Sequence, residues 1–431
     1  MAGRSGRGPF RRVEPEPVIG RDPAAQWSFV VGVVPTRRAE ALLILSVHGS
    51  KVTDIRVRKD GAVRVRSGRR GPGPERGVNW PSPGPARAGT PPPYDVHVAR
   101  DLAIDLGTSN TQVFARGRGV ILEEPTVIAL NTRSHEVLAV GDEAWQLIGR
   151  TPGYIVAVRP LREGAITDFD ITERTIKLLL RRAGLTMFNR PRVLICVPSA
   201  ITSVERRAVK EAARRAGASA AHLIEQPMAA AIGAGLDVHE PVGSMVVDVG
   251  GGTTETAVIS LGGIVAYRAV RCGGFDMDAA IQEYVRQKYG VAISERTGEE
   301  LKIAIGSALP YEGELRVEVR GREISTGRPR LVILTADEIR FALEEQVDLI
   351  VDTVLGCLSD APPELAQDII YEGIHLLGGG AKLRGLAERL TRETDVPVHL
   401  VPEPIECVVR GAGLCLDSFD SLRPIFAAAE S

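Results

Sequence analysis

The chain has 431 residues, of which 44% are hydrophobic and 25% are charged, and its formal net charge is −1. A chain of this length can bury more than one hydrophobic core. Its longest apolar runs fall well short of the roughly 18 residues that span a bilayer, so no transmembrane helix is predicted. Five cysteines form no Cys-x-x-Cys pair, which predicts neither a disulfide framework nor a zinc site and favours a reducing cytoplasm.

The first 99 residues differ in charge from the rest. They carry 17 Lys and Arg against 8 Asp and Glu, a balance of +9, which leaves 36 of the 53 basic and 46 of the 54 acidic residues, or −10, for residues 100–431. Arg, Gly and Pro dominate this segment, a composition that favours disorder over packing. A basic tail could bind nucleic acid or an anionic membrane. We favour a misassigned start codon, with the true start near Tyr94 to Arg100, because the segment carries no motif.

The most informative element follows a short apolar stretch at residues 102–104. It reads Asp105-Leu106-Gly107-Thr108-Ser109-Asn110-Thr111: an acid, an aliphatic residue, a glycine, three variable positions and a threonine. A buried strand that ends in a carboxylate, followed by a turn of small residues, directs amide N–H groups and hydroxyls at an anion. The chain then returns through residues 112–115, which predicts a β-hairpin.

The next segment alternates strands and helices. Short strand-like pieces with turns between residues 124 and 168 predict a small inserted subdomain. An amphipathic helix over 171–182 and a buried strand over 192–197 follow. Thr202-Ser203-Val204-Glu205 has the pattern of a capping box and predicts a helix that runs to Gly217. This alternation predicts the α/β class.

A second copy of the acid-and-glycine pattern follows an apolar stretch at residues 245–247. It reads Asp248-Val249-Gly250-Gly251-Gly252-Thr253-Thr254 and lies 143 residues after the first (248 minus 105). Two such turns facing each other would hold a polyphosphate, and Asp105 and Asp248 would suit Mg²⁺, which prefers oxygen ligands. The plainer alternative is a pair of tight hairpins, but duplication is an architectural signal. Neither copy is a Walker A loop or a Rossmann fingerprint.

The last part repeats the first in looser form. We predict a helix over 276–289, a long insert over 290–334 and a helix over 336–358. Each half therefore consists of a sheet with helices and an insertion, and the nucleotide is expected in the cleft between the halves, with hinge closure around it.

The ordered set of motifs resembles the actin-like ATPases, and among them the bacterial rod-shape family MreB. The resemblance covers nearly all of residues 101–416, and its further motifs are Glu123–Ala129, Thr202–Ala208, Pro227–Gly235, Val246–Glu255, Glu295–Thr297, Leu376–Gly380 and Arg410–Gly413. It implies two duplicated ribonuclease-H-like halves, each with an inserted subdomain. The implied boundaries are 100–127, 170–240 and 408–420 for subdomain IA, 128–169 for IB, 241–276 and 336–407 for IIA, 277–335 for IIB, and 421–431 for a tail.

The resemblance also implies roles for individual residues. The phosphates of ATP would be held by Gly107, Thr108, Ser109 and Asn110 and by Gly250, Gly251, Gly252 and Thr253. Asp105 and Asp248 would hold Mg²⁺ largely through water. Gly378, Gly379 and Gly380 would allow close approach of the backbone to the adenosine, and Glu299 and Lys302 would contact ribose and adenine. For that last pair, an ordinary i,i+3 surface ion pair is the alternative.

One residue departs from the family pattern. Where that pattern has Glu-Glu-Pro-Met, this chain has Glu225-Gln226-Pro227-Met228. Glutamine can position water but cannot act as a general base. Because phosphoryl transfer depends mainly on positioning and charge, we expect slow ATP hydrolysis, with Gln226 and Thr253 placing the attacking water.

The resemblance finally implies a membrane contact and a biological role. Met187 and Phe188 lie where the family carries an exposed apolar loop that enters the bilayer, although such residues are often buried in a core. The implied protein is a cytoplasmic, membrane-peripheral ATPase that polymerises with itself and organises cell-wall elongation proteins. A nucleotide-dependent chaperone and a small-molecule kinase on the same fold are the alternatives. Nucleic-acid binding is not predicted, because 4% aromatic residues offer no base-stacking platform.

Overall fold

The structure is a computed structural model and describes residues 101–134, 136–162, 165–166, 169–183, 190–419, 422 and 426, together with four strands nearer the N-terminus. Those strands, β1 (Val33–Pro35), β2 (Ala41–Ser46), β3 (Val52–Val57) and β4 (Ala62–Ser67), pair antiparallel in chain order. They belong to a separate compact unit, and the description below concerns the other unit, residues 87–314 and 319–431. These four strands lie within residues 1–99, the segment for which disorder or a misassigned start is predicted; the rest of that segment lies outside the described residues, as do the membrane residues Met187 and Phe188.

The first half is built on a five-stranded sheet. Its order is β14 (Ala220–Glu225), β13 (Arg192–Val197), β5 (Asp101–Leu106), β6 (Asn110–Ala115) and β7 (Gly119–Pro125). β5 lies parallel to β13 and antiparallel to β6. The predicted hairpin at Asp105 and the predicted strand over 192–197 are therefore confirmed.

The second half repeats this topology. Its sheet has the order β17 (Gly263–Val270), β16 (Thr254–Ser260), β15 (Ser244–Val249), β21 (Ile374–Leu377) and β22 (Val398–Leu400). β15 lies antiparallel to β16 and parallel to β21, as β5 does to its two neighbours. The duplication predicted from two short motifs thus extends to whole sheets.

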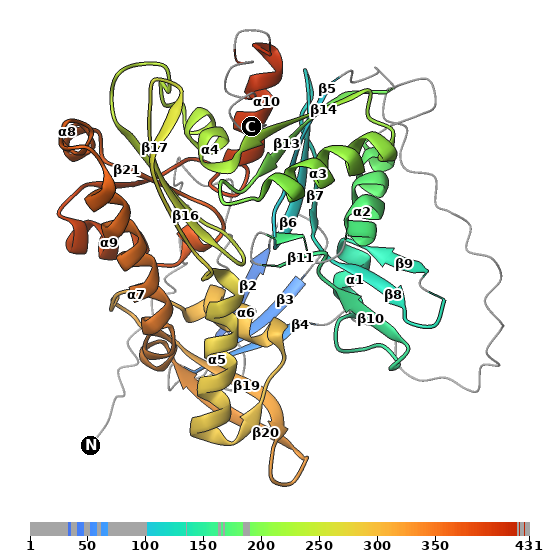
Figure 1. The fold of residues 1–431 in the computed structure, drawn as a ribbon. Coiled ribbons are helices and arrows are strands. Elements are labelled where there is room, and N and C mark those ends of the chain that lie inside the picture. The colour runs from blue at the N-terminus through green and yellow to red at the C-terminus, as the bar shows by residue number, and fades with distance from the viewer. Residues whose placement is uncertain are drawn as a thin grey trace, which may run out of the picture. The chain divides into compact units, whose positions relative to one another are not determined.

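Helices cover both faces of the first sheet, and one helical layer is shared with the second (Figure 1). Side chains of α2 (Phe169–Arg182) and α3 (Ser203–Ala216) form a core with one face. α4 (Gln226–Gly233) and α10 (Cys407–Asp417) fill the space between the two sheets. The predicted capping box at the start of α3 is present, with both Thr202 and Glu205 bonded. Packing of α4 and α10 against both sheets makes the two halves share a core.

The remaining elements form the insertions and the outer layer of the second half. The first insertion contains β8 (Ile128–Asn131), β9 (Val137–Val140), α1 (Asp142–Leu147) and β10 (Ile155–Val158), followed by β11 (Leu161–Arg162) and β12 (Ala165–Ile166). The second half adds α5 (Gly274–Tyr289), β18 (Val291–Ala292), α6 (Glu295–Ile305), β19 (Arg316–Glu323), β20 (Pro329–Thr335), α7 (Ala336–Asp360), α8 (Pro363–Glu372), η1 (Gly380–Lys382) and α9 (Leu386–Thr394). The predicted insert over 290–334 therefore contains a helix, α6, that the sequence analysis did not separate. Within the described residues, no helix is both long and apolar enough to cross a bilayer.

Candidate functional site

The first glycine turn lies between β5 and β6 and is held from behind. A Cβ at Gly107 would lie 2.6 Å from the carbonyl oxygen of Asn110, so the turn requires glycine. Thr126 donates its hydroxyl to the Gly107 carbonyl at 2.7 Å and its backbone N–H to the Ser109 carbonyl at 2.8 Å. Thr111 shares a 2.8 Å hydrogen bond with the Thr126 hydroxyl. Two carbonyl oxygens of the turn are thus satisfied from the side of β7.

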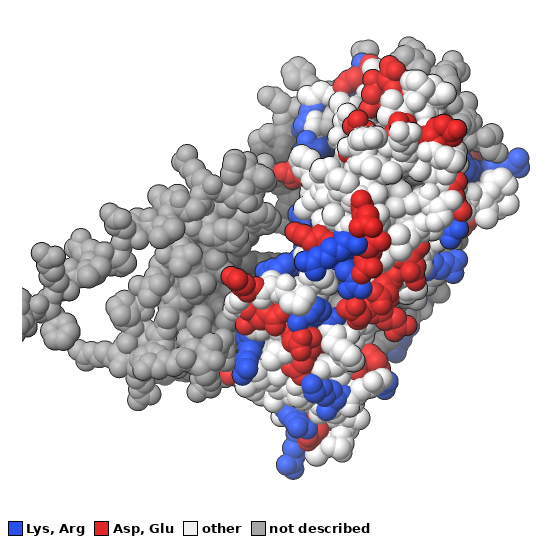
Figure 2. Space-filling view, turned by 90° about the vertical axis from the view of Figure 1, so that its left-hand side faces the viewer, with Lys and Arg blue, Asp and Glu red and all other residues white. Residues whose placement is uncertain are grey.

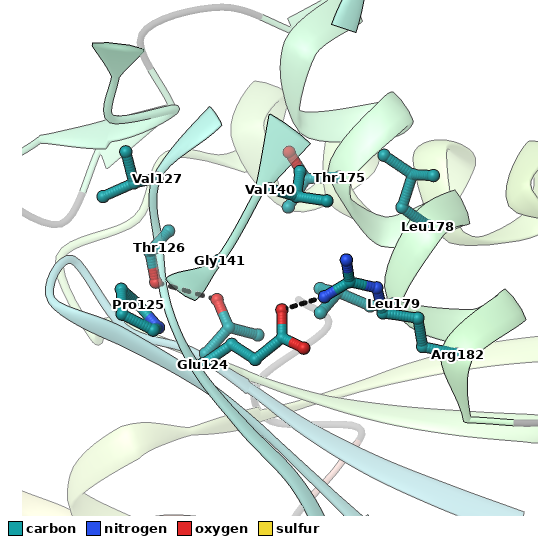
Figure 3. Close-up of a pocket in the computed structure, with 11 residues that line it drawn as sticks. Glu124, Pro125, Thr126, Val127, Val140, Gly141, Thr175, Leu178, Leu179 and Arg182 are labelled. Carbon is teal, nitrogen blue, oxygen red and sulfur yellow. Dashed lines mark hydrogen bonds and ion pairs between the residues drawn. The ribbon is translucent and has the colours of Figure 1, made fainter. Parts of the chain in front are cut away.

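A small cavity lies behind this turn, between β7 and α2 (Figure 3). Its volume is about 20 Å³, which is room for a single water molecule. Glu124 enters it and accepts a hydrogen bond from Arg182 at the end of α2. The pKa of Glu124 is raised, because the effect of burial outweighs the opposing effect of the neighbouring Arg182. The cavity is too small for a nucleotide. Thr111 and Thr126, which hold the turn, are among the residues that line it.

The second glycine turn lies between β15 and β16 and contacts the start of α5. The N–H of Gly250 donates to the carbonyl of Thr253 at 2.9 Å and closes the turn. The N–H of Gly274 donates to the Gly250 carbonyl at 3.0 Å, and that of Phe275 donates to the Gly251 carbonyl at 2.8 Å. The first N–H groups of α5, which have no partner within the helix, are therefore bonded to the turn.

The two turns meet, as predicted. A Cβ built on Gly251 would lie 2.6 Å from the Cβ of Ser109, so the two turns are in contact. Burial raises the pKa of Asp105 to about 6. Burial, and then the charge of Asp105, raise the pKa of Asp248 to about 7. When both carboxyls are ionised, their negative charges repel each other in a buried site. A hard cation that binds their oxygen atoms would stabilise the ionised forms.

Gln226 is directed at the first carboxylate. It is the first residue of α4, and its Nε2 donates to Oδ1 of Asp105 at 3.0 Å. An ionised glutamate at this position could not donate that hydrogen bond. The departure from the family pattern therefore has a local structural consequence, which is a neutral donor for Asp105.

The three glycines after β21 lie against the second turn. A Cβ at Gly378 would lie 2.3 Å from Oδ1 of Asp248, and the φ of Gly378 is +87°. A Cβ at Gly380 would lie 2.4 Å from Cγ1 of Val249, whereas Gly379 has no heavy atom within 4 Å of the same position. Gly378 and Gly380 thus lie close to Asp248 and Val249, and the close approach of Gly378, Gly379 and Gly380 to adenosine stays a prediction.

Lys302 does not pair with Glu299. Its Nζ lies 2.8 Å from Oδ1 of Asp278 and donates to the Gly274 carbonyl at 2.7 Å. The alternative of an i,i+3 surface ion pair is therefore wrong, because Lys302 is bonded to the buried Asp278 and to a carbonyl of α5 instead. Lys302 joins α6 to the start of α5, beside the second turn, and the contacts of Glu299 and Lys302 with ribose and adenine stay predictions.

Comparisons with known proteins agree with this arrangement. A family model described as "MreB/Mbl protein" matches residues 99–424. The chain belongs to the MreB/Mbl family. It is 49% identical to the cell shape-determining protein MreB of Escherichia coli K12 over 75% of this chain and 94% of the relative. It is 44% identical to the cell shape-determining protein Mbl of Bacillus subtilis 168 over 75% of this chain and 98% of that protein.

Solved structures confirm the fold of this MreB/Mbl chain. MreB5 of Spiroplasma citri bound to ADP has a TM-score of 0.72 at 34% identity and covers 74% of this chain and 97% of its own. A double helical filament of MamK has a TM-score of 0.62 at 18% identity, a likeness that concerns the fold alone. The chain is thus a bacterial actin of the cell-shape-determining kind, and the chaperone and kinase alternatives are set aside.

Glu255 of this MreB/Mbl chain was missed in the sequence analysis. It pairs across the hairpin with Asp248, as Gln112 pairs with Asp105, so each acid has a polar residue opposite it. Glu255 is 4% exposed, and burial, followed by the charge of Asp248, raises its pKa to about 8. Among the described residues, its Oε2 has no hydrogen-bond partner. The sequence carries a signal for this residue: Glu255 and Gln112 each lie seven positions after the acid of their own motif, on the second strand of the hairpin.

Proposed function

We propose that this bacterial actin binds ATP with Mg²⁺ in the cleft between its halves, hydrolyses it slowly, and assembles with itself into membrane-associated filaments. The observation that carries the proposal is the contact of the two glycine turns, with Asp105 and Asp248 beside them. MreB5 of Spiroplasma citri, 33–34% identical, has been solved with ADP and with AMPPNP, which supports nucleotide binding by this chain.

Each group of the site has a task in this proposal. Asp105 and Asp248 hold Mg²⁺ largely through water; when bound, the ion neutralises phosphate charge. Across the described ranges, no group of three or more His, Cys, Asp or Glu is arranged to hold a metal, so most ligands come from water and the nucleotide. Gln226 and Thr253 place the attacking water. Because Gln226 cannot accept the proton as a base, hydrolysis is slow.

Self-association would use exposed surfaces outside the glycine turns. Large apolar side chains are exposed on the second half, among them Ile370 at 55% and Tyr371 at 78% on α8. The side of the molecule on which α8 and α9 lie shows a broad area without charge above a region of mixed charges (Figure 2). Head-to-tail contacts that do not close a ring produce open filaments, and exposed apolar side chains such as Ile370 and Tyr371 support such contacts.

Sedimentation tests the proposal directly. The full chain is incubated with Mg²⁺ and with ATP, ADP or no nucleotide, and pelleted protein and released phosphate are measured together. We expect pelleting that requires ATP and a slow release of phosphate. Asp248→Asn should lose both activities. A wild-type chain that stays in the supernatant while it hydrolyses ATP would contradict filament assembly.

The membrane contact has its own experiment. Met187→Ser combined with Phe188→Ser should abolish co-pelleting of the polymer with anionic liposomes, because one or two apolar side chains bind weakly and depend on avidity along a filament. Pelleting without liposomes is the control and should be unchanged. Unchanged binding to liposomes would show that these two residues do not make the contact. Organisation of wall-synthesis proteins at the membrane follows from this proposal as its biological output.

A further inference from the structure

Arg159 joins the two halves of the protein at a point away from the glycine turns. It directly follows β10 in the insertion of the first half, and its Nη2 lies 2.6 Å from Oε1 of Glu295, the first residue of α6 in the second half. The side chain of Arg159 is 17% exposed and that of Glu295 is 33% exposed. An ion pair this far removed from water is screened less than a surface pair.

The guanidinium of Arg159 also lies against two aromatic rings. Its Cζ is 4.1 Å from the centroid of the Phe275 ring on α5 and 5.4 Å from that of the Trp145 ring on α1. Arg159 therefore has a ring from each half beside it. A cation over an aromatic face is attracted by the ring, and more so when both are desolvated.

Phe275 connects this contact to the second glycine turn. Its N–H donates to the Gly251 carbonyl at 2.8 Å, and its ring carbon Cε2 lies 3.3 Å from the position of a Cβ on Gly251. Gly251 in turn contacts Ser109 of the first turn. Phe275 therefore links Arg159 to the same short segment that contacts the first turn.

One buried N–H group of Arg159 makes no hydrogen bond in this contact. The Nε of Arg159 is buried and has no hydrogen-bond partner among the described residues. A buried donor without a partner costs free energy, and the contacts that hold Arg159 here are the ion pair with Glu295 and the two aromatic rings. Such a contact can open and close without breaking a saturated network.

We propose that Arg159, with Glu295 and Phe275, forms a cleft bridge that sets the rate at which nucleotide leaves. The inference rests on the proposed function, because it places the nucleotide in the cleft. A nucleotide enters or leaves only when the halves separate, and separation breaks the Arg159–Glu295 ion pair and lifts the guanidinium from Phe275. Arg159 is a positioning residue in this scheme and does not take part in the hydrolysis step.

The rate of ADP release measures the cleft bridge. The full chain is loaded with a fluorescent ADP and Mg²⁺, and release is followed after addition of excess unlabelled ADP. We expect Arg159→Gln and Glu295→Gln each to release ADP roughly tenfold faster. The double variant should be no faster than Arg159→Gln alone, because both substitutions remove one interaction. Hydrolysis in a single turnover of bound ATP should change less than twofold, which separates positioning from catalysis.

A matched control lies on the same helix. Arg296 and Glu300 form an i,i+4 ion pair at 3.1 Å on α6, with both side chains at least 40% exposed, and Glu300→Gln should leave release unchanged. Wild-type release rates in both cleft-bridge variants, with ADP still bound, would overturn the cleft bridge and leave the proposed function intact. A wild-type chain that binds no ADP would overturn both. Arg159→Lys, which keeps the charge but not the planar stack, should give an intermediate rate and guards against misfolding of the glutamine variant.

Discussion

Gln226→Glu tests whether the amide is required to hold Asp105. The Nε2 of Gln226 donates to Oδ1 of Asp105 at 3.0 Å, and Asp105 is only 9% exposed. Glutamate keeps the size of the side chain but, when ionised, offers no donor and adds a charge. A hydrogen bond to a charged group contributes about 1.5–3 kcal/mol, and an unpaired buried charge adds to the loss. We expect the free energy of unfolding of the nucleotide-free protein to fall by about 3 kcal/mol at pH 8.

The loss should depend on pH in a defined direction. Burial raises the pKa of Asp105 to about 6, above the ordinary 3.8. A carboxyl whose pKa is raised on folding stabilises the protein at low pH, and that stability is lost as the pH rises through the folded pKa. A second carboxyl at position 226 raises the pKa further. Near pH 5 one of the two carboxyls is protonated and donates to the other, so the variant should recover most of its stability.

Urea unfolding without Mg²⁺ at pH 5 and pH 8 measures both effects. The matched control is Gln287→Glu, because Nε2 of Gln287 also donates to a carboxylate, Oε1 of Glu283, at 2.7 Å, but on an exposed helix face. The control should change little at either pH. Equal losses in the two variants, or a loss in Gln226→Glu that does not change with pH, would refute the reasoning. Unchanged ATP turnover in Gln226→Glu would further show that Gln226 does not place the attacking water.

Three other predictions follow from the same site. The midpoint temperature of thermal unfolding, measured without Mg²⁺, should fall as the pH is raised from about 5 to about 9. Burial raises the pKa of Asp248 to about 7 and that of Glu255 to about 8, so the folded protein holds protons that the unfolded chain releases. Glu255→Gln should flatten this profile, and a level wild-type profile would contradict the shifts. Gly378→Ala should cost about 2 kcal/mol or more in urea unfolding, since its Cβ would lie 2.3 Å from Asp248, whereas Gly379→Ala, with open space around it, should cost little. Thr126→Val removes the 2.7 Å hydrogen bond to the first turn and should cost about 1–2 kcal/mol and weaken ADP binding in calorimetry; unchanged affinity would mean that the turn is rigid without it.

Local elements were predictable because their signals are local. The hairpins at both acids, the strand over 192–197 and the capping box at Thr202 each depend on residues a few positions apart, whose turn and cap preferences are expressed within the segment itself. The insert over 290–334 was the exception. Ser294 caps α6 through a hydrogen bond from the N–H of Thr297, and a serine before this segment is a helix start signal in the sequence.

Partners of charged and polar side chains were less predictable. The three-residue spacing suggests Glu299 as the partner of Lys302, but its partner is Asp278 on the adjoining helix. The sequence does carry a signal for Glu255, because its seven-residue distance from Asp248 repeats that of Gln112 from Asp105. For Lys302, burial selects the partner, because a charge removed from water costs far more when it is unpaired than a surface charge does.

From the sequence alone follow the duplication, the two glycine turns, the acids that precede them and the family. These are determined locally, by strand periodicity and by positions that only small residues can occupy. Only the tertiary structure decided that the turns touch at Ser109 and Gly251, that Gln226 donates to an acid 121 residues away, and that Arg159 lies between rings of both halves. Such contacts depend on how two sheets pack on the shared layer of α4 and α10, and packing at that distance leaves no periodic signal in the chain.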